Sequence, residues 1–379
     1  MRFTPCDPLD VADAAHPRRR FLVASLSALA LTGLRPGPLI AGEPLVSMSQ
    51  ASSLRLISQP GRIFRTSVPG NEAVDSWACW VIVQAENDAA IEATGLTVEL
   101  FNGAELVKSA SYTAAGVRAL AIKPPLTPKL PDGSLPARPI FWPLAIRIRQ
   151  TEASPLTIDS MRVVLELRTG MRSAQQVDVT LPIETYRQKS ELLFPFRGKG
   201  IILQAGVTNG GHRNRSGQFA LDAFGVDDSW SIIAAGDGKQ NANYRGWGRE
   251  VLAPADGIIV RARGDRPDQP LPETSDPRYY APEYPNGGDV GNTVTIDHGN
   301  AEFSMLAHFR AGSLRVKVGD RVRQGQTLGA LGNSGDTSGP HVHYQLQTGP
   351  DWEYADALPV KFSNVDQPSL VRGTYFDAK

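Results

Sequence analysis

The chain consists of short segments with the period of β-strands, separated by turn residues, and almost none of it has the period of a helix. Between residues 43 and 190 these segments include Trp80–Gln84, Leu96–Leu100, Ile146–Arg149 and Met161–Leu167. Several short strands broken by Gly and Pro are typical of a β-sandwich. We therefore expect an all-β protein whose residues 43–190 form an immunoglobulin-like β-sandwich.

The second half of the chain is also of β type, and no long amphipathic helix is visible in it. Gly257–Ala262, Asn292–Asp297 and Phe303–His308 have the composition of strands, and a turn at His298–Asn300 joins the last two into a predicted hairpin. Repeated Val-Gly-Asp and Gly-Gln phrases around residues 316–332 fit tight turns between short strands. We expect a β-sheet or barrel-like domain over residues 195–360, followed by a C-terminal tail at 361–379.

Length, charge and cysteine content limit the number of domains, the kinds of partner and the disulfides that this chain can have. The 379 residues are enough for two domains, each with its own core. The formal net charge is zero, so no basic field suggests a nucleic-acid partner. The chain has two cysteines, Cys6 and Cys79. If Cys6 is removed with a signal segment, no intramolecular disulfide can form.

Residues 1–41 have the features of an export signal. Arg18 and Arg19 are followed after one residue by Phe21-Leu22, as in twin-arginine signals. The apolar run from Phe21 to Leu34 is shorter than the 18 or more residues that span a bilayer. We expect cleavage after Ala41, a periplasmic or extracellular location and no permanent membrane anchor. An uncleaved anchor or a basic cytoplasmic N-terminus remains the alternative.

Histidines are concentrated in the second half of the chain. Five of the six lie between residues 212 and 343. His341 and His343 follow a turn rich in Gly, Ser and Pro, and they alternate with apolar residues together with Gln345 and Gln347. Residues i and i+2 of a strand share a face, so both imidazoles should point the same way while Val342, Tyr344 and Leu346 face the core. An isolated pair of this kind can also be two surface histidines, so the assignment depends on its partners.

Two further groups could complete a metal site. His212 lies in a glycine-rich loop, and Asp222 lies on the strand face opposite Phe219 and Leu221. Two histidines and one carboxylate, with an open fourth position, are typical of catalytic rather than structural zinc. Oxygen and imidazole ligands without thiolate also suit an oxidising compartment. Asp227 and Asp228 are the alternatives to Asp222.

Four motifs in residues 200–350 together resemble the LytM/lysostaphin-type zinc peptidases, which cut peptide bonds in bacterial peptidoglycan. They are Gly211-His212, Ala220-Leu221-Asp222, Ala307-His308-Phe309 and the segment from Gly335 to His343. The resemblance implies a LytM-like peptidase domain with the duplicated hybrid motif fold. It differs in one respect: ten residues separate His212 from Asp222, whereas the commoner pattern has only a few.

The resemblance also implies a role for each site residue. His212, Asp222 and His343 would bind Zn²⁺, which lowers the pKa of a bound water and polarises the scissile carbonyl. His341 and His308 would be the catalytic histidines, transferring protons or stabilising the oxyanion. The substrate would be peptidoglycan peptides, and the protein partners of the N-terminal domain are not indicated.

Competing interpretations remain at several places. A catalytically inactive LytM-like regulator or wall-binding protein would typically lack a ligand, whereas every ligand position is filled here. A sugar-phosphotransfer carrier with a histidine pair would not need the export signal. His298 lies in a turn, where it is expected to have a structural role. The proline-rich loop between Arg263 and Asp289 either borders the substrate groove or is an ordinary surface loop.

The export signal can be tested directly. Changing Arg18 and Arg19 to Lys should leave the full-length precursor in the cytoplasm, because the twin-arginine pathway reads the arginine pair itself. Fractionation followed by immunoblotting would measure this. Undiminished export of the double variant would count against the twin-arginine route.

Overall fold

A computed structural model describes most of the chain beyond residue 53. The described residues are 54–59, 61–68, 71–85, 90–122, 141–153, 157–170, 174–205, 212, 216–270, 272, 290–352, 355–367 and 369–379. The expected signal segment, residues 1–41, lies outside the described residues. So do residues 273–289 of the proline-rich loop that could border the substrate groove. No helix among the described residues is long and apolar enough to cross a membrane.

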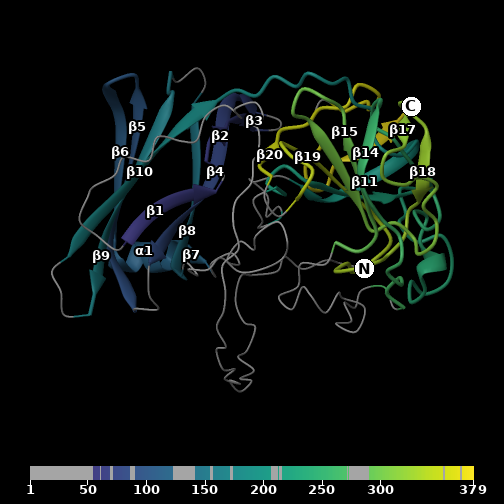
Figure 1. Cartoon of the computed structure of the whole chain (residues 1–379), viewed down its shortest axis with the longest axis horizontal. Coiled ribbons are helices and arrows are strands. Elements are labelled where there is room, and N and C mark those ends of the chain that lie inside the picture. Colours follow the sequence, from purple (N-terminus) through teal and green to yellow (C-terminus); the bar gives the residue numbers. More distant parts are fainter. Residues whose placement is uncertain are drawn as a thin grey trace, which may run out of the picture. The chain divides into compact units, whose positions relative to one another are not determined.

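The N-terminal part contains two separate five-stranded sheets (Figure 1). One has the strand order β1-β4-β8-β7, with β3 paired to β4, and the other has the order β2-β10-β9-β5-β6. The bounds of the first sheet are β1 Leu54–Gln59, β3 Thr66–Val68, β4 Asn71–Ala85, β7 Ala121–Ile122 and β8 Phe141–Ala153. Those of the second are β2 Ile63–Phe64, β5 Ile91–Asn102, β6 Glu105–Thr113, β9 Ser160–Thr169 and β10 Gln175–Glu184, and the helix α1 spans Ala114–Leu120.

Residues of both N-terminal sheets share one hydrophobic core, as the alternating sequence predicts. Leu96, Val98 and Leu100 of β5 are buried at every second position, and Val81 and Val83 of β4 belong to the same core. Alternation of this kind is what a strand needs when one face packs inward. Cys79 is also buried there, and burial raises the pKa of its thiol to about 12.

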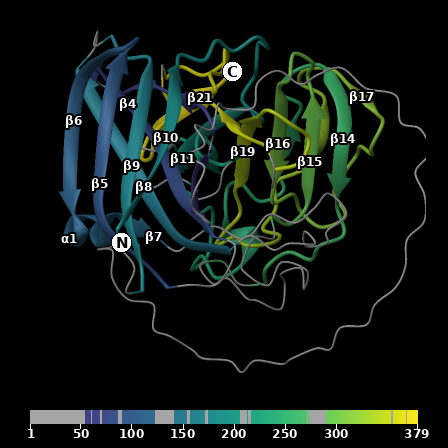
Figure 2. The same cartoon turned by 60° about the vertical axis from the view of Figure 1, so that its left-hand side comes forward.

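The C-terminal part is a nine-stranded sheet with the order β17-β14-β15-β16-β19-β12-β11-β21, in which β20 also pairs with β19 (Figure 2). Strands β13 and β18 form a separate pair, and η1 is a short 3₁₀ turn at Asn241–Asn243. The bounds are β11 Gly198–Ala205, β12 Leu221–Gly225, β13 Glu250–Leu252, β14 Gly257–Arg263, β15 Thr293–Asp297, β16 Phe303–Ala307, β17 Arg321–Val322, β18 Thr327–Ala330, β19 Val342–Gln347, β20 Ala357–Leu358 and β21 Tyr375–Ala378. The expected strands at 257–262, 292–297 and 303–308 are therefore present, and β15 and β16 form the predicted antiparallel hairpin.

Strand β19 lies between β16 and β12 and is buried on both faces. The prediction that Val342, Tyr344 and Leu346 face the core is confirmed. Tyr344 and Leu346 enter the hydrophobic core of this sheet. The polar face is covered as well, because the rings of His212 and His308 lie against His343 and His341. The polar face of β19 therefore forms one side of a buried polar site.

The segment expected as a C-terminal tail contributes to this sheet. β21 pairs with β11, with Phe376 opposite Gly200. The Phe376 side chain is fully buried, with its ring centroid 4.5 Å from that of Phe194 and 5.9 Å from that of Phe196. Residues 375–378 thus form an edge strand whose aromatic side chain belongs to the core.

His298 has the structural role expected from its position in a turn. Its Nδ1–H donates to the Asp256 carbonyl at 2.8 Å. Because a neutral imidazole carries one proton, Nε2 then accepts from the Ser304 hydroxyl at 2.7 Å. The Tyr344 hydroxyl lies 2.8 Å from the same Ser304 oxygen. The ring thus ties the β15–β16 hairpin to β19 and to the Asp256 loop.

Acidification should therefore weaken the fold through His298. Burial lowers the pKa of this ring below its ordinary value. Above about pH 6.5 the ring is neutral in both the folded and the unfolded chain, whereas below it only the unfolded chain readily takes the proton, so stability falls as pH falls. The free energy of unfolding should drop more between about pH 7 and about pH 5 in the wild type than in His298→Gln. Chemical denaturation at each pH measures this, and parallel curves would contradict it.

Candidate metal centre

Pairing among β12, β19 and β16 places Asp222 and His343 side by side and brings the end of β16 next to them. In the pairing of β12 with β19, Asp222 lies directly opposite His343. In the pairing of β16 with β19, Ala307 lies opposite the same histidine, so His308 follows at the end of β16. The centre is thus set by strand register among segments about 35 to 120 residues apart in the sequence.

His212, Asp222 and His343 come together as a group that could hold a metal ion. One ligand atom from each lies within 4.8 Å of the others. Asp222 Oδ2 is 3.3 Å from His212 Nε2, and Asp222 Oδ1 is 3.0 Å from His343 Nδ1. Ligands about 2.1 Å from a tetrahedral ion are about 3.4 Å apart, so these two separations suit a shared ion.

The contacts of His343 call for positive charge between its ring and Asp222. Its Nδ1 faces the Asp222 carboxylate, and its Nε2 is 2.9 Å from the side-chain oxygen of Gln345. Both neighbours are oxygen acceptors, yet a neutral imidazole has a single proton to donate. One of the two contacts therefore requires an additional positive charge, either a second proton or a metal ion. A buried carboxylate with two imidazoles is a donor set that divalent metals bind.

His341 and His308 lie beside this group with their Nε2 atoms available as acceptors. Nδ1 of His341 donates to the Gly339 carbonyl at 2.8 Å, and Nδ1 of His308 donates to the Ser334 carbonyl at 2.7 Å. A backbone carbonyl can only accept, so each neutral ring keeps its lone pair on Nε2. His341 Nε2 is buried without a hydrogen-bond partner among the described residues, and it lies 3.5 Å from Asp222 Oδ1. The two ring centroids are 4.6 Å apart.

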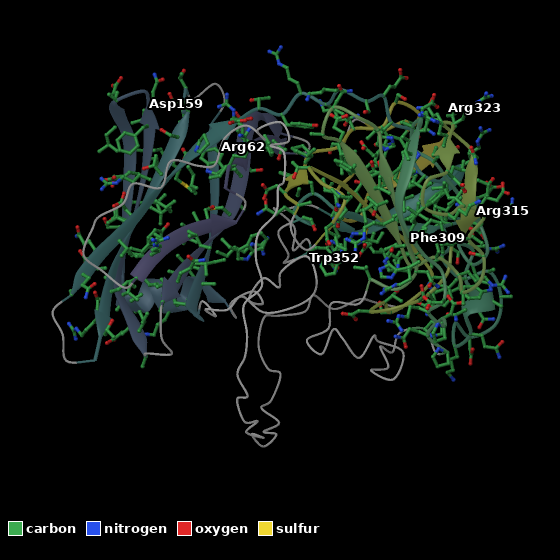
Figure 3. The ribbon with its side chains drawn as sticks, viewed as in Figure 1. Arg62, Asp159, Phe309, Arg315, Arg323 and Trp352 are labelled. Carbon is green, nitrogen blue, oxygen red and sulfur yellow. The ribbon has the colours of Figure 1, made fainter. Side chains whose placement is uncertain are left out.

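The backbone at His308 is held in an uncommon conformation. Its φ is +66°, in the left-handed region that non-glycine residues seldom occupy and that costs about 1–3 kcal/mol. The conformation is fixed on both sides, because Gly332 N donates to the His308 carbonyl and Phe309 N donates to the Asn292 carbonyl. The next residue, Phe309, labelled in Figure 3, is buried in the core of the C-terminal sheet. This turn directs the chain into the core while the His308 ring stays with the site.

Burial and the neighbouring histidines shift the pKa of Asp222 in opposite directions. Burial by itself raises the pKa of Asp222, but the neighbouring His212 and His341 rings outweigh it and hold the pKa well below its usual range. Asp222 is therefore a carboxylate near neutral pH. Burial, reinforced by His341 and His343, holds the pKa of His308 well below its usual value, so His308 is neutral there.

The two alternative carboxylates lie in other surroundings. Asp227 accepts hydrogen bonds from Ser229 and Ser231 and forms an ion pair with Arg245. The Asp228 side chain is almost fully exposed and pairs with Lys199. Neither belongs to the group of potential metal ligands among the described residues. The choice of Asp222 over these alternatives agrees with the geometry.

Residues that the sequence pattern does not single out support the catalytic histidine candidates. Phe224 stacks on the His341 ring, with centroids 4.9 Å apart and planes 11° apart. Thr337 lies 3.2 Å from His341 Nδ1, and its hydroxyl donates to Asn333 or to the Gly339 carbonyl. Phe224 had a signal, since it is two residues from Asp222 on the same strand face. Thr337 and Asn333 had none, because their positions depend on how the loop folds back.

Comparison with family models gives a match to the C-terminal part of the chain. Residues 241–355 match the family described as Peptidase family M23. That segment contains His308, His341 and His343, whereas His212 and Asp222 precede it.

Among curated proteins, the peptidoglycan DD-endopeptidase ShyA of Vibrio cholerae is 29% identical over 142 residues, which cover 34% of this chain and 27% of that protein. The peptidoglycan DD-endopeptidase ShyC of the same organism is 46% identical over 56 residues, which cover 15% of this chain and 12% of that protein. The matched segments thus span only a small part of these relatives.

Among solved structures, the catalytic domain of lysostaphin from Staphylococcus simulans is 19% identical, with a TM-score of 0.25, and the match covers 42% of this chain and 88% of that one.

Proposed function

We propose that the protein is a zinc metalloendopeptidase that hydrolyses peptide cross-links of peptidoglycan, because residues 241–355 match peptidase family M23. The observation that carries the proposal is the convergence of His212, Asp222 and His343, beside two more histidines with free Nε2 lone pairs. His212 and Asp222 lie before the matched segment, yet they meet His343 through the pairing of β12 with β19. The names of ShyA and ShyC favour a D,D cross-link as the bond that is cut.

His212, Asp222 and His343 would hold the zinc. When bound, zinc supplies a Lewis acid that polarises the scissile carbonyl and lowers the pKa of a coordinated water. Near neutral pH the ionised Asp222 adds a negative charge that offsets the charge of the ion. The burial of His343 and the partial burial of His212 and Asp222 limit competition from bulk water.

His341 is the proposed proton-transfer group. Its Nδ1–H is engaged by Gly339, so Nε2 can take a proton from the attacking water and return it to the leaving amine. The carboxylate of Asp222, 3.5 Å from Nε2, stabilises the imidazolium that forms in between. Stacking on Phe224 and the contact with Thr337 keep the ring from rotating.

His308 is proposed as a second acceptor that orients water. While neutral, with Nδ1–H given to Ser334, it has no proton on Nε2 to donate to an oxyanion. This favours the proton-transfer alternative over oxyanion stabilisation for His308. The left-handed backbone at His308 is energetically unfavourable, and such conformations are concentrated at functional sites.

We also propose how the chain is organised and where it acts. Export through a twin-arginine signal at residues 1–41 to the periplasm or exterior agrees with a peptidoglycan substrate. The proposed domains are an immunoglobulin-like sandwich at 43–190 and a peptidase domain beginning near 195. The pairing of β21 with β11 supports including residues 361–379 in the peptidase domain.

Removing a proposed ligand should abolish both metal binding and activity. Asp222→Asn and His343→Ala should bind zinc at least about 100-fold more weakly than the wild type and should release no peptides from purified peptidoglycan. Asp228→Asn is the matched control, because this exposed carboxylate is paired with Lys199 and lies outside the proposed ligand group, and it should retain both properties. Zinc stoichiometry and chromatography of released peptides measure the two outcomes.

Two results would reject the enzyme proposal. One is full activity in His343→Ala, and the other is a wild-type protein that binds no metal. A wild type that binds zinc but releases no peptides would favour the inactive regulator or wall-binding protein instead.

His341→Gln should separate proton transfer from metal binding. The variant should keep stoichiometric zinc, because His341 is not among the proposed ligands, while kcat falls by about 10²–10⁴-fold with little change in KM. Loss of zinc together with activity would instead make His341 a ligand. Unchanged kcat would exclude it from proton transfer.

A further inference from the structure

The polar face of β19 continues beyond the histidines into two buried glutamines. Gln345 is 2% exposed and Gln347 is 0% exposed. With His343 they occupy alternate positions of the strand and so share one face. Nothing in the proposed reaction uses them, and apolar residues would fill the same space without polar atoms to satisfy. Burying two amides therefore calls for a reason.

The side chains of His343, Gln345 and Gln347 form a continuous hydrogen-bonded chain that ends on the backbone. His343 Nε2 contacts Gln345 Oε1 at 2.9 Å, and Gln345 Nε2 donates to Gln347 Oε1. Gln347 Nε2 then donates to the carbonyl of Gly349 at 2.7 Å. Each amide thus uses its oxygen toward the histidine and its nitrogen away from it.

The last acceptor sets the direction of the whole chain. The Gly349 carbonyl can only accept, so Gln347 must present its NH₂ group there and its oxygen to Gln345. Gln345 must then present its NH₂ group to Gln347 and its oxygen to His343. When a metal ion occupies the space between Nδ1 and Asp222, the oxygen of Gln345 accepts the single ring proton from Nε2 and the lone pair lies on Nδ1. Nδ1 is the atom that faces Asp222.

We propose that Gln345 and Gln347 are positioning residues that hold His343 with its proton on Nε2 and its Nδ1 lone pair directed at the metal. The inference rests on the proposed role of His343 as a ligand. Hydrogen bonds in series polarise one another, and a buried chain with every group satisfied also fixes the ring plane. The neighbouring His341 and His308 carry their proton on the other nitrogen, Nδ1, so the site contains both tautomers, each imposed by a different acceptor.

Replacing Gln345 should leave the Nε2–H of His343 without its acceptor. In the zinc-loaded wild type, NMR should find the Nε2 proton of His343 at a downfield shift, because it is hydrogen-bonded to Gln345. In zinc-loaded Gln345→Met the same resonance should move upfield, since the thioether is at most a weak acceptor. An unchanged shift in a variant that still binds zinc would overturn the inference. A wild type that takes up no zinc would instead reject the proposed function, so the two failures can be told apart.

Zinc affinity gives a second, independent measure. Gln345→Met should bind zinc about 10–100-fold more weakly, measured by competition with a chromophoric chelator. Gln345→Glu should remain close to the wild type, because a carboxylate still accepts from Nε2. Leu346→Met is the matched control on the next position and the opposite face of β19, and it should leave the affinity unchanged. Equal losses in the Met and Glu variants of Gln345 would contradict the proposal.

The role of Gln347 can be tested even if Gln345→Met does not fold. Gln347→Met alone should weaken zinc binding by less than Gln345→Met, because the Gln345 amide then loses its fixed orientation but keeps its contact with the ring. In the Gln345→Glu background the same change should have little effect, since both carboxylate oxygens are acceptors in either orientation. An undiminished effect of Gln347→Met in that background would show that Gln347 does not act by orienting Gln345.

Discussion

The centre depends on the pairing of β19 with two neighbours, β12 and β16. This pairing places Asp222 beside His343 on one side and the end of β16, followed by His308, on the other. Because side chains alternate along a strand, a shift of one residue in either pairing would turn the carboxylate or the histidines to the opposite face. The hydrophobic positions Val342, Tyr344 and Leu346 oppose such a shift, so the apolar core also sets the geometry of the polar site.

Within that frame, backbone carbonyls and amides decide where each ring proton lies. Gly339 and Ser334 engage Nδ1 of His341 and His308, while Gln345 engages Nε2 of His343. Rings of the same chemical type thereby divide into a proposed ligand with its lone pair on Nδ1 and two proposed acceptors with theirs on Nε2. The ionised Asp222 lies beside the rings of His341 and His343. Its negative charge would stabilise a metal ion or an imidazolium there.

Much of this could be predicted from residue pattern alone. The β-type strands, the hairpin at His298 and the shared face of His341 and His343 follow from alternation and turn residues, which are local properties. The selection of Asp222 over Asp227 also followed from alternation, since only Asp222 lies in a strand-like run opposite Phe219 and Leu221. Phe224 shares the strand face of Asp222 and so could have been predicted, whereas Thr337 and Asn333 could not, because they reach His341 only through the fold of the preceding loop.

The order of the residues thus fixes which residue types are available and which of them share a strand face. It also placed Gln345 and Gln347 on the face of the histidines, but it could not assign them a direction. Only the tertiary structure decided that direction, because it depends on the carbonyl of Gly349 at the end of the chain of hydrogen bonds. A hydrogen bond between distant groups is a relation in space, whereas the period of a strand is already present in the order of the residues.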